Sequence, residues 1–273
     1  GNSMKRGGAG IPLVHATPMP FDNYFDGTQP DFLWMEKLLQ DSGSGLNEPA
    51  AVIVETVQGE GGINPARVEW LQGLDALCKR NGILLIVDDV QMGIGRTGPF
   101  FSFEIAGIQP DIVCISKSIS GYGLPMALTL IKPEHDVWGP GEHNGTFRGN
   151  NPAFVTATAA IHEFWSDGAL ERSTIAKGER VEEAFTEIAA RSHTVELTPK
   201  GRGLARGLQF SQPELAAKAC AAAFERGLLM ETSGPSDEVM KILPALTITG
   251  AELDEGLEIV RESVHAVVEG MSG

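Results

Sequence analysis

Residues 82–91 read Gly-Ile-Leu-Leu-Ile-Val-Asp-Asp-Val-Gln, residues 95–98 read Gly-Arg-Thr-Gly, and residues 110–118 read Pro-Asp-Ile-Val-Cys-Ile-Ser-Lys-Ser. This stretch contains two short apolar runs, at 83–87 and 112–115, that are rich in Ile and Val. Both runs are too short for ordinary helices and are flanked by turn-forming residues. We therefore predict two buried strands of a parallel sheet.

Each predicted strand is followed by charged residues. Asp88 and Asp89 end the first strand, and Lys117 follows the second. In open α/β sheets ligands bind at the carboxyl ends of the strands, so we expect a carboxylate and a lysine to face one crevice. Pyridoxal 5'-phosphate requires such a pair, with the lysine in a Schiff base and the acid holding its ring nitrogen protonated.

The whole stretch resembles the class III aminotransferases, which are pyridoxal phosphate enzymes of fold type I. Their pattern is an apolar strand, Asp-Glu-Val-Gln, a Gly-Arg-Thr-Gly turn, Pro-Asp-Ile and then the lysine that binds the cofactor. Asp89 departs mildly from this pattern, which has Glu there. The resemblance implies an α/β fold: a large domain with a mostly parallel sheet and a smaller C-terminal α+β domain.

The resemblance also implies roles for five residues that bind the cofactor. Lys117 would hold the cofactor and later act as the base that moves a proton on the substrate. Asp88 would pair with the ring nitrogen, Val90 would lie against the ring, and Gln91 would reach its phenolic oxygen. Thr146, in a glycine-rich loop, would bind the cofactor phosphate of the neighbouring subunit.

Three further residues are implied to bind substrate. In the family an arginine grips the carboxylate nearest the cofactor, and a glutamate masks this arginine when no such carboxylate is present. The matching residues here are Lys241 and Glu55, and Glu60 matches a glutamate at the substrate entrance. Lysine is a flexible point charge without the planar fork of arginine, so we expect a looser masking pair.

Composition excludes several classes of protein. A net charge of −15 over 273 residues argues against binding to nucleic acid, and no apolar run approaches the length of a membrane span. The three cysteines are far apart, and the histidines show no metal-ligand spacing. We therefore expect a cytoplasmic protein with reduced thiols, no metal and small-molecule substrates, namely an amino acid and a 2-oxo acid.

The rest of the chain predicts a domain boundary near 166–168, giving a large domain over 1–167 and a small domain over 168–273. In the first part we expect a strand at 50–57, a helix beginning at Asn64-Pro65, a strand at 126–131 and a helix at 152–165. In the second part we expect helices at 169–190, 212–226 and 251–269, and strands at 194–197, 204–210, 228–231 and 239–243. Thr249 and Glu252 form a capping-box signature for the last helix.

Other classes of function fit the sequence less well. An ATPase would need a GxxxxGK[ST] loop, which is missing, and Gly121-Tyr-Gly123 is too little for a dinucleotide site. A catalytically silent protein would not be expected to keep both Lys117 and Asp88. Within the family, the chain is most similar to the branch that transaminates the terminal amine of L-2,4-diaminobutyrate in the ectoine pathway. Ornithine, acetylornithine and 4-aminobutyrate aminotransferases and aminomutases remain alternatives.

Two expectations concern the whole molecule. Because Thr146 would serve the neighbouring subunit, we expect a homodimer or a dimer of dimers. The family also has an N-terminal portion with a phosphate-binding helix start and an aromatic that stacks on the cofactor ring. Neither has a counterpart in the 273 residues, so we expect the natural protein to extend upstream.

Overall fold

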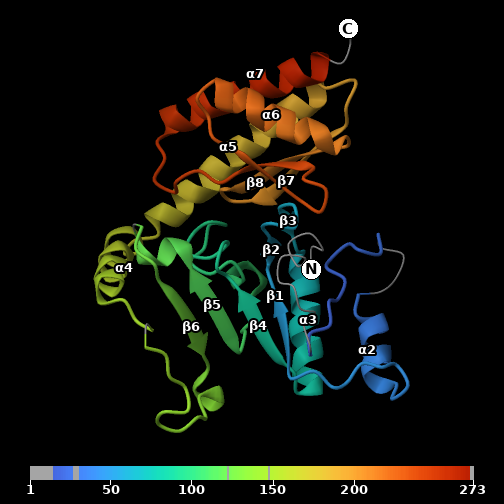
Figure 1. Ribbon diagram of the computed structural model, residues 1–273, viewed down its shortest axis with the longest axis vertical. Coiled ribbons are helices and arrows are strands. Elements are labelled where there is room, and N and C mark those ends of the chain that lie inside the picture. The colour runs from blue at the N-terminus through green and yellow to red at the C-terminus, as the bar shows by residue number, and fades with distance from the viewer. Residues whose placement is uncertain (1–14, 27–30, 122, 147, 271–273) are drawn as a thin grey trace.

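The computed structural model describes residues 15–26, 31–121, 123–146 and 148–270. Figure 1 shows two layered parts, a lower part around a mostly parallel sheet and an upper part around an antiparallel sheet. Residues 1–14 lie outside the described residues. The two-part arrangement agrees with the predicted α/β fold class.

The lower sheet has the order β1-β4-β5-β6 within the described part of the chain. Its strands are β1 (Ala51–Val54), β4 (Leu84–Asp88), β5 (Ile112–Ser116) and β6 (Ala127–Ile131). β1, β4 and β5 run parallel, and β6 pairs antiparallel with β5. The two strands predicted at 83–87 and 112–115 are thus confirmed as neighbours, to within about one residue at their ends.

The core of this part lies between the lower sheet and helix α3 (Val68–Asn81). Leu71, Leu74 and Leu77 recur at helical spacing and are buried against Leu85 and Val87 of β4. The short helix α2 (Leu33–Gln40) adds Met35 to the same core. On the opposite face of the sheet Ile53 remains 63% exposed.

Helix α3 begins at Val68, not at Asn64-Pro65 as predicted. Asn64 and Pro65 form the short strand β3, which pairs with β2 (Val57–Gln58). The Asn64 side chain donates to Gln58 Oε1 and to the Gly61 carbonyl, both at 2.9 Å, so it cannot cap the helix. A carboxylate from far upstream takes the capping role.

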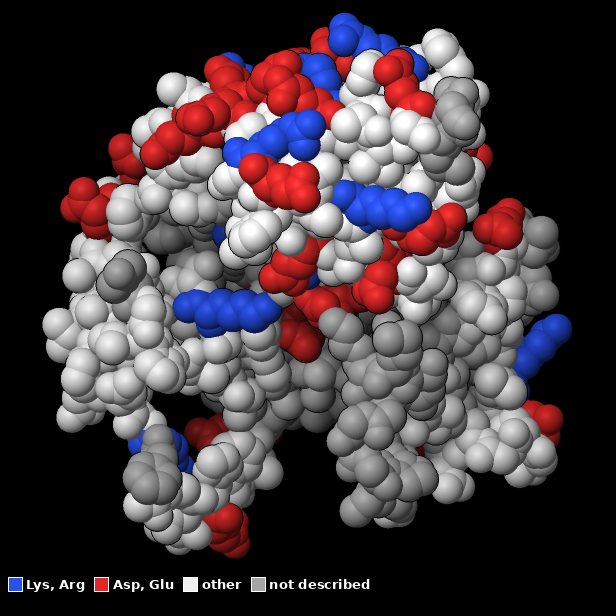
Figure 2. All heavy atoms as spheres, turned by 45° about the horizontal axis from the view of Figure 1, so that its top comes forward, with Lys and Arg blue, Asp and Glu red and all other residues white. Residues whose placement is uncertain are grey.

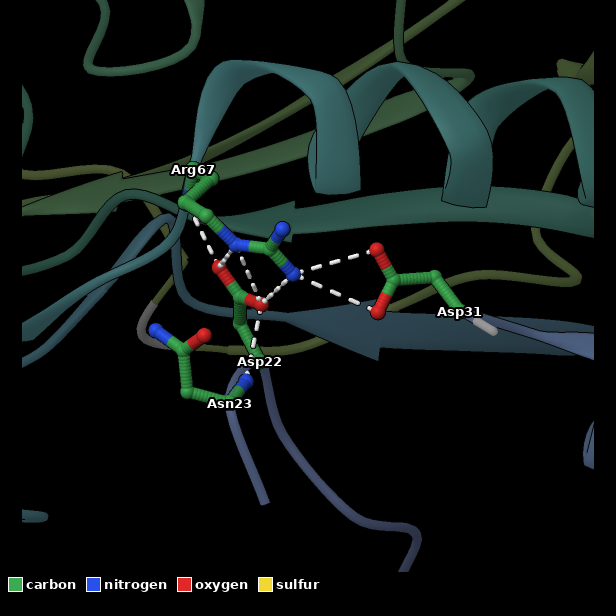
Figure 3. A network of polar contacts seen from close by, with 4 residues as sticks. All are labelled: Asp22, Asn23, Asp31 and Arg67. Carbon is green, nitrogen blue, oxygen red and sulfur yellow. Dashed lines mark hydrogen bonds and ion pairs between the residues drawn. The ribbon is translucent and has the colours of Figure 1, made fainter. Parts of the chain in front are cut away.

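That carboxylate belongs to Asp22. Its Oδ2 atom accepts the backbone N–H of Arg67 at 2.7 Å, at the positive end of the α3 dipole. The Arg67 side chain in turn bonds Asp22 and Asp31 (Figure 3). This network holds the N-terminal segment against the start of α3.

The upper sheet has the order β7-β8-β10-β9, and all its pairs are antiparallel. Its strands are β7 (Leu197–Arg202), β8 (Ala205–Phe210), β10 (Val239–Ile242) and β9 (Glu231–Ser233). Helices α5 (Ala169–Arg191), α6 (Pro213–Glu225) and α7 (Gly250–Glu269) cover the side away from the lower sheet (Figure 1). The Thr249–Glu252 capping box at the start of α7 is confirmed.

Two predicted strands are displaced. The strand expected at 194–197 lies at 197–202, and the strand expected at 228–231 lies at 231–233. Both are edge strands of the upper sheet. An edge strand is paired on one side only and tolerates polar residues, so an apolar run does not mark it.

The two parts meet through loops and through a small apolar cluster. Val57, Ile63 and Met92 of the lower part pack against Ala205 and Val239 of the upper sheet. Helix α4 (Asn151–Phe164) and Gly168, which precedes α5, lie between the parts in sequence. The predicted domain division at 167/168 falls in this connection and stays a prediction. Short 3-10 turns complete the described elements at Glu104–Ala106, Lys117–Ser120 and Pro133–His135.

Candidate active site at the strand ends

Acidic residues and a lysine gather where three parallel strands end. Glu55 follows β1, Asp88 is the last residue of β4, and Lys117 follows β5. The register pairs Val54 with Val87 and Asp88 with Cys114, so the three strand ends lie at the same edge of the sheet. The structure thus brings together the residues that the sequence placed at one crevice.

Lys117 has an unusual backbone conformation. Its φ is +51°, in the left-handed region that a residue with a Cβ seldom adopts. It begins the 3-10 turn Lys117–Ser120, and Ser116 Oγ donates to the Met126 carbonyl at 2.6 Å just before it. Strained conformations of this kind cluster at functional sites. The Lys117 side chain is exposed.

Asp88 and Gln91 offer polar groups to a ligand. Asp88 is half-buried, and its Oδ1 atom accepts the Val90 N–H at 3.1 Å. Gln91 Oε1 is buried and has no hydrogen-bond partner among the described residues. Buried polar atoms without partners are rare, and a bound polar ligand would satisfy this one. An acid, a lysine and an unsatisfied amide fit the ring nitrogen, aldehyde carbon and phenolic oxygen of pyridoxal phosphate.

Glu55 lies next to these residues on the β1 side. Its Oε2 atom accepts the Gly59 N–H at 2.9 Å, and its pKa is raised, first by burial and further by the charges of Asp88 and Glu60. A Cβ on Gly59 would lie 1.8 Å from Gln91 Oε1, so the Gln91 side chain lies directly against this glycine. Glu55 therefore lies at the same edge of the sheet as Asp88, beside the Gly59–Gln91 contact.

Lys241 pairs with Glu60 and not with Glu55, which corrects the expected partner. The Lys241 ammonium on β10 is 2.8 Å from Glu60 Oε1 and 3.1 Å from Glu231 Oε2. Glycines flank Glu60 in sequence, and the Gly234 N–H donates to the Glu60 carbonyl at 3.1 Å. This docking carries Glu60 to the upper sheet, whereas the Gly59 N–H holds Glu55 in the lower part.

Thr146 lies in an exposed loop that precedes α4. The neighbouring Arg148 N–H donates to the Gly145 carbonyl at 3.1 Å, which shapes the loop as a turn. Helix α4 packs against the Lys117–Ser120 turn, where a Cβ on Gly121 would lie 2.8 Å from Ala160 Cβ. The loop thus leads into the helix that supports the lysine, and the role of Thr146 stays a prediction.

Sequence reasoning assigned no role to the second acid or to its hydrogen-bond partners. Asp89 is buried, and both of its oxygens accept hydrogen bonds from Ser102. Burial raises the pKa of Asp89 to about 6, although the Ser102 bonds and Arg202 oppose this rise. The adjacent acids Asp88 and Asp89 were the only sequence signal for this network, because Ser102 and Arg202 lie in a loop and an edge strand without a recognisable motif.

Two hollows elsewhere are lined by other residues. One, of about 250 Å³, is lined by aromatic rings such as Phe21, Trp34 and Trp70, and the other, of about 560 Å³, lies between Tyr24, Asn64 and Lys200. Among the described residues, no three or more His, Cys, Asp or Glu side chains form a group that could hold a metal ion. The same part of the chain contains no helix that is long and apolar enough to cross a bilayer.

Comparison with known proteins gives a family and close relatives. The family model described as aminotransferase class-III matches residues 17–264. The diaminobutyrate--2-oxoglutarate transaminase of Streptomyces anulatus is 66% identical over 97% of this chain and 63% of that protein. The enzyme of the same name from Virgibacillus pantothenticus is 54% identical over 98% of this chain and 64% of that protein.

Solved structures agree with the fold. Ornithine δ-aminotransferase of Plasmodium falciparum matches with a TM-score of 0.76 and 29% identity, over 86% of this chain and 59% of that one. N-acetylornithine aminotransferase of Stenotrophomonas maltophilia matches with a TM-score of 0.75 and 28% identity, over 88% and 61% of the two chains. The chain therefore spans less than two thirds of the length of the curated relatives cited above.

Proposed function

The chain belongs to the class III aminotransferase family, and we propose that it carries the active-site core of an enzyme that transfers the terminal amine of L-2,4-diaminobutyrate to 2-oxoglutarate. The observation that supports catalysis is the meeting of Lys117 and Asp88 at adjacent strand ends. The substrate assignment is supported by relatives of that name that are 53–66% identical over nearly the whole chain.

Enzymes of this family use pyridoxal 5'-phosphate, and we assign its contacts to residues at the strand ends. Asp88 would hold the ring nitrogen protonated in a charge-assisted pair, Gln91 would bond the phenolic oxygen, and Val90 would contact the ring. Lys117 would attach the cofactor and then take and return the proton at the substrate carbon. When bound, the cofactor supplies an electron-withdrawing ring that stabilises negative charge on that carbon.

We assign the choice between substrates to Lys241 and Glu60. Glutamate places its α-carboxylate close to the cofactor, whereas diaminobutyrate reacting at its terminal amine does not. Lys241 would bind the near carboxylate, and Glu60 would neutralise Lys241 when none is present. The 2.8 Å contact between them supports this pairing. Glu55, which the sequence suggested for the masking role, would instead adjust the charge of the cofactor site.

We further propose a homodimer in the cytoplasm. Helix α4 buries only Ala153 and Ala157, while apolar side chains on its other faces are exposed, namely Phe154, Val155, Ile161 and Phe164. Figure 2 shows charged side chains gathered mainly over the helices of the upper part, and the face around α4 is largely uncharged. An apolar helix beside the Thr146 loop suits a subunit interface. The cytoplasm is supported by three free thiols.

The test begins with the visible absorbance of the purified enzyme. We expect an absorbance that borohydride abolishes in the parent protein and that Lys117→Ala lacks, with loss of turnover in this variant. Diaminobutyrate, ornithine, N-acetylornithine and 4-aminobutyrate should then be compared as donors. Ornithine is the substrate named for one of the enzymes of solved structure that this chain resembles. A preference for ornithine would overturn the substrate assignment while leaving the cofactor assignment intact.

A further inference from the structure

Ser102 is a buried hydrogen-bonding centre beneath the strand ends. It is 0% exposed, and each of its polar groups has a partner. Its N–H donates to Asp89 Oδ2 at 2.9 Å, its hydroxyl donates to Asp89 Oδ1, and its carbonyl accepts from Arg202 Nη2 at 2.6 Å. Because the single hydroxyl proton goes to the carboxylate, Thr56 Oγ1 must be the donor in its 2.5 Å contact with Ser102 Oγ.

The partners of Ser102 come from separate segments, and those in the lower part adjoin the strand ends. Thr56 follows Glu55 at the end of β1, and Asp89 follows Asp88 at the end of β4. The Asp89 N–H donates to the Cys114 carbonyl of β5 at 2.8 Å, which ties in the strand that leads to Lys117. Arg202 comes from the far end of β7, in the upper sheet.

Arg202 reaches Asp89 through Ser102 and not by a direct ion pair among the described residues. Burial lowers the pKa of Arg202 to about 10, so it stays protonated at neutral pH, and the charge of Asp89 opposes the lowering. The Nε atom of Arg202 is buried without a partner in the described structure. The Arg202 guanidinium therefore donates a hydrogen bond to the Ser102 carbonyl and is attracted by the negative charge of Asp89.

The placement of the two acids links this centre to the cofactor. Successive residues of a strand point to opposite faces, so Asp89 turns away from the side on which Asp88 lies. Among the described residues, the Asp88 side chain accepts a hydrogen bond only from the Val90 N–H, two positions away, and this local bond does not fix the strand end. Asp89 is anchored on the opposite side by Ser102.

We propose that Asp89, Ser102 and Arg202 form a positioning hub that sets the orientation of Asp88, and that the upper sheet acts on the cofactor site through Arg202. The proposal rests on the proposed role of Asp88. None of the three residues touches the reacting atoms. They would act by holding the end of β4 in one conformation.

The test compares variants of the complete enzyme in two measurements, the dissociation constant of pyridoxal phosphate and the pH at which the visible absorbance of the bound cofactor changes. Arg202→Met should weaken cofactor binding about tenfold, because a hydrogen bond from a charged group is lost, and should shift the pH of the spectral change. Arg202→Lys should restore most of both, since a lysine keeps the charge and reaches the same carbonyl. Arg180→Met is the control, because Arg180 lies on α5 and pairs with Asp254 of α7, away from the hub.

The proposal is overturned if Arg202→Met and Arg180→Met lose affinity equally, in proportion to their loss of stability, or if Arg202→Met equals the parent. Thr56→Val, which removes one hydroxyl without changing shape, gives a milder test should Arg202→Met not fold. A spectral shift in Thr56→Val supports the hub, and a spectrum identical to the parent contradicts it. Failure of the parent to bind the cofactor would instead overturn the proposed function.

Discussion

The ammonium of Lys241 lies 2.8 Å from Oε1 of Glu60, although 181 positions separate the two residues. The Lys241 side chain is 2% exposed, and Glu231 on the paired strand β9 supplies a second carboxylate at 3.1 Å. A buried ammonium held in this way is already neutralised. In the proposed role of Lys241, a substrate carboxylate would displace Glu60 in order to reach the ammonium.

The first prediction concerns the two halves of the reaction. Lys241→Met should slow the half-reaction with 2-oxoglutarate by about 100-fold, because a charge-assisted contact of about 2–3 kcal/mol is lost. The half-reaction with diaminobutyrate should change much less. Glu60→Gln should do the reverse, since the uncovered ammonium would favour substrates with a near carboxylate. Single-turnover rates of each half, measured separately, check both statements.

Glu55→Gln provides the contrast for this experiment. Glu55 accepts the Gly59 N–H and lies beside Asp88, so its loss should affect both half-reactions alike. If Glu55→Gln spares the 2-oxoglutarate half and selectively harms the other, the masking role belongs to Glu55 after all. Equal rates of both halves in Lys241→Met and the parent would remove Lys241 from the carboxylate site.

The second prediction concerns pH and stability. Burial raises the pKa of Asp89 from 3.8 to about 6, so between these values the folded chain holds a proton that the unfolded chain releases. The stability from this group is fully present below pH 3.8 and is lost as the pH rises through about 6. Asp89→Asn should therefore gain roughly 2 kcal/mol relative to the parent between pH 4 and pH 8. Urea unfolding at both pH values measures this, and a difference that does not change with pH contradicts it.

The third prediction concerns the tip of the β7–β8 hairpin. Gly203 has φ +56°, and a Cβ there would lie 2.6 Å from the backbone carbon of Thr97. Gly107 has a similar φ of +63° with nothing within 4 Å, so it is a matched control. Gly107→Ala should cost about 1 kcal/mol from backbone strain alone, and Gly203→Ala about 3 kcal/mol or more because backbones also collide. Equal losses of unfolding free energy would show that the close approach is not rigid.

Local signals account for what the sequence predicted well. Strands β4 and β5 are central in the lower sheet, and their apolar runs and terminal charges lie within a few residues of each other. The sequence therefore located Asp88 and Lys117 at one edge without any long-range information. The edge strands β7 and β9 lacked such a signal because one side of each is unpaired.

The missed features depend on contacts between distant segments. The resemblance assigned the masking role to Glu55, and only the docking of the Glu60 loop on Gly234 carries Glu60 to Lys241. The same holds for Ser102 and Arg202, whose bond joins positions 100 apart. The start of α3 was misplaced because its cap, Asp22, lies 45 residues upstream.

The fourth prediction concerns the exposed face of α4. Val155 is 69% exposed on a helix whose outer side chains are largely apolar, so Val155→Glu places a charge on the proposed subunit interface. We expect the variant to remain folded and to shift toward the monomer, since burying an unpaired charge is costly. Sedimentation over a range of concentrations checks this. A dimer constant unchanged in Val155→Glu would place the interface elsewhere.

The last prediction asks whether Thr146 serves the neighbouring subunit. If it does, a mixed dimer of Lys117→Ala and Thr146→Ala subunits has one site that lacks both side chains and one site that has both. Equal co-expression makes about half of the dimers mixed, so about a quarter of the parent's sites should be complete. The mixture should therefore exceed the mean activity of the two variants prepared separately. If Thr146 binds the phosphate in its own subunit, every site in the mixed dimer lacks one side chain and no activity is regained.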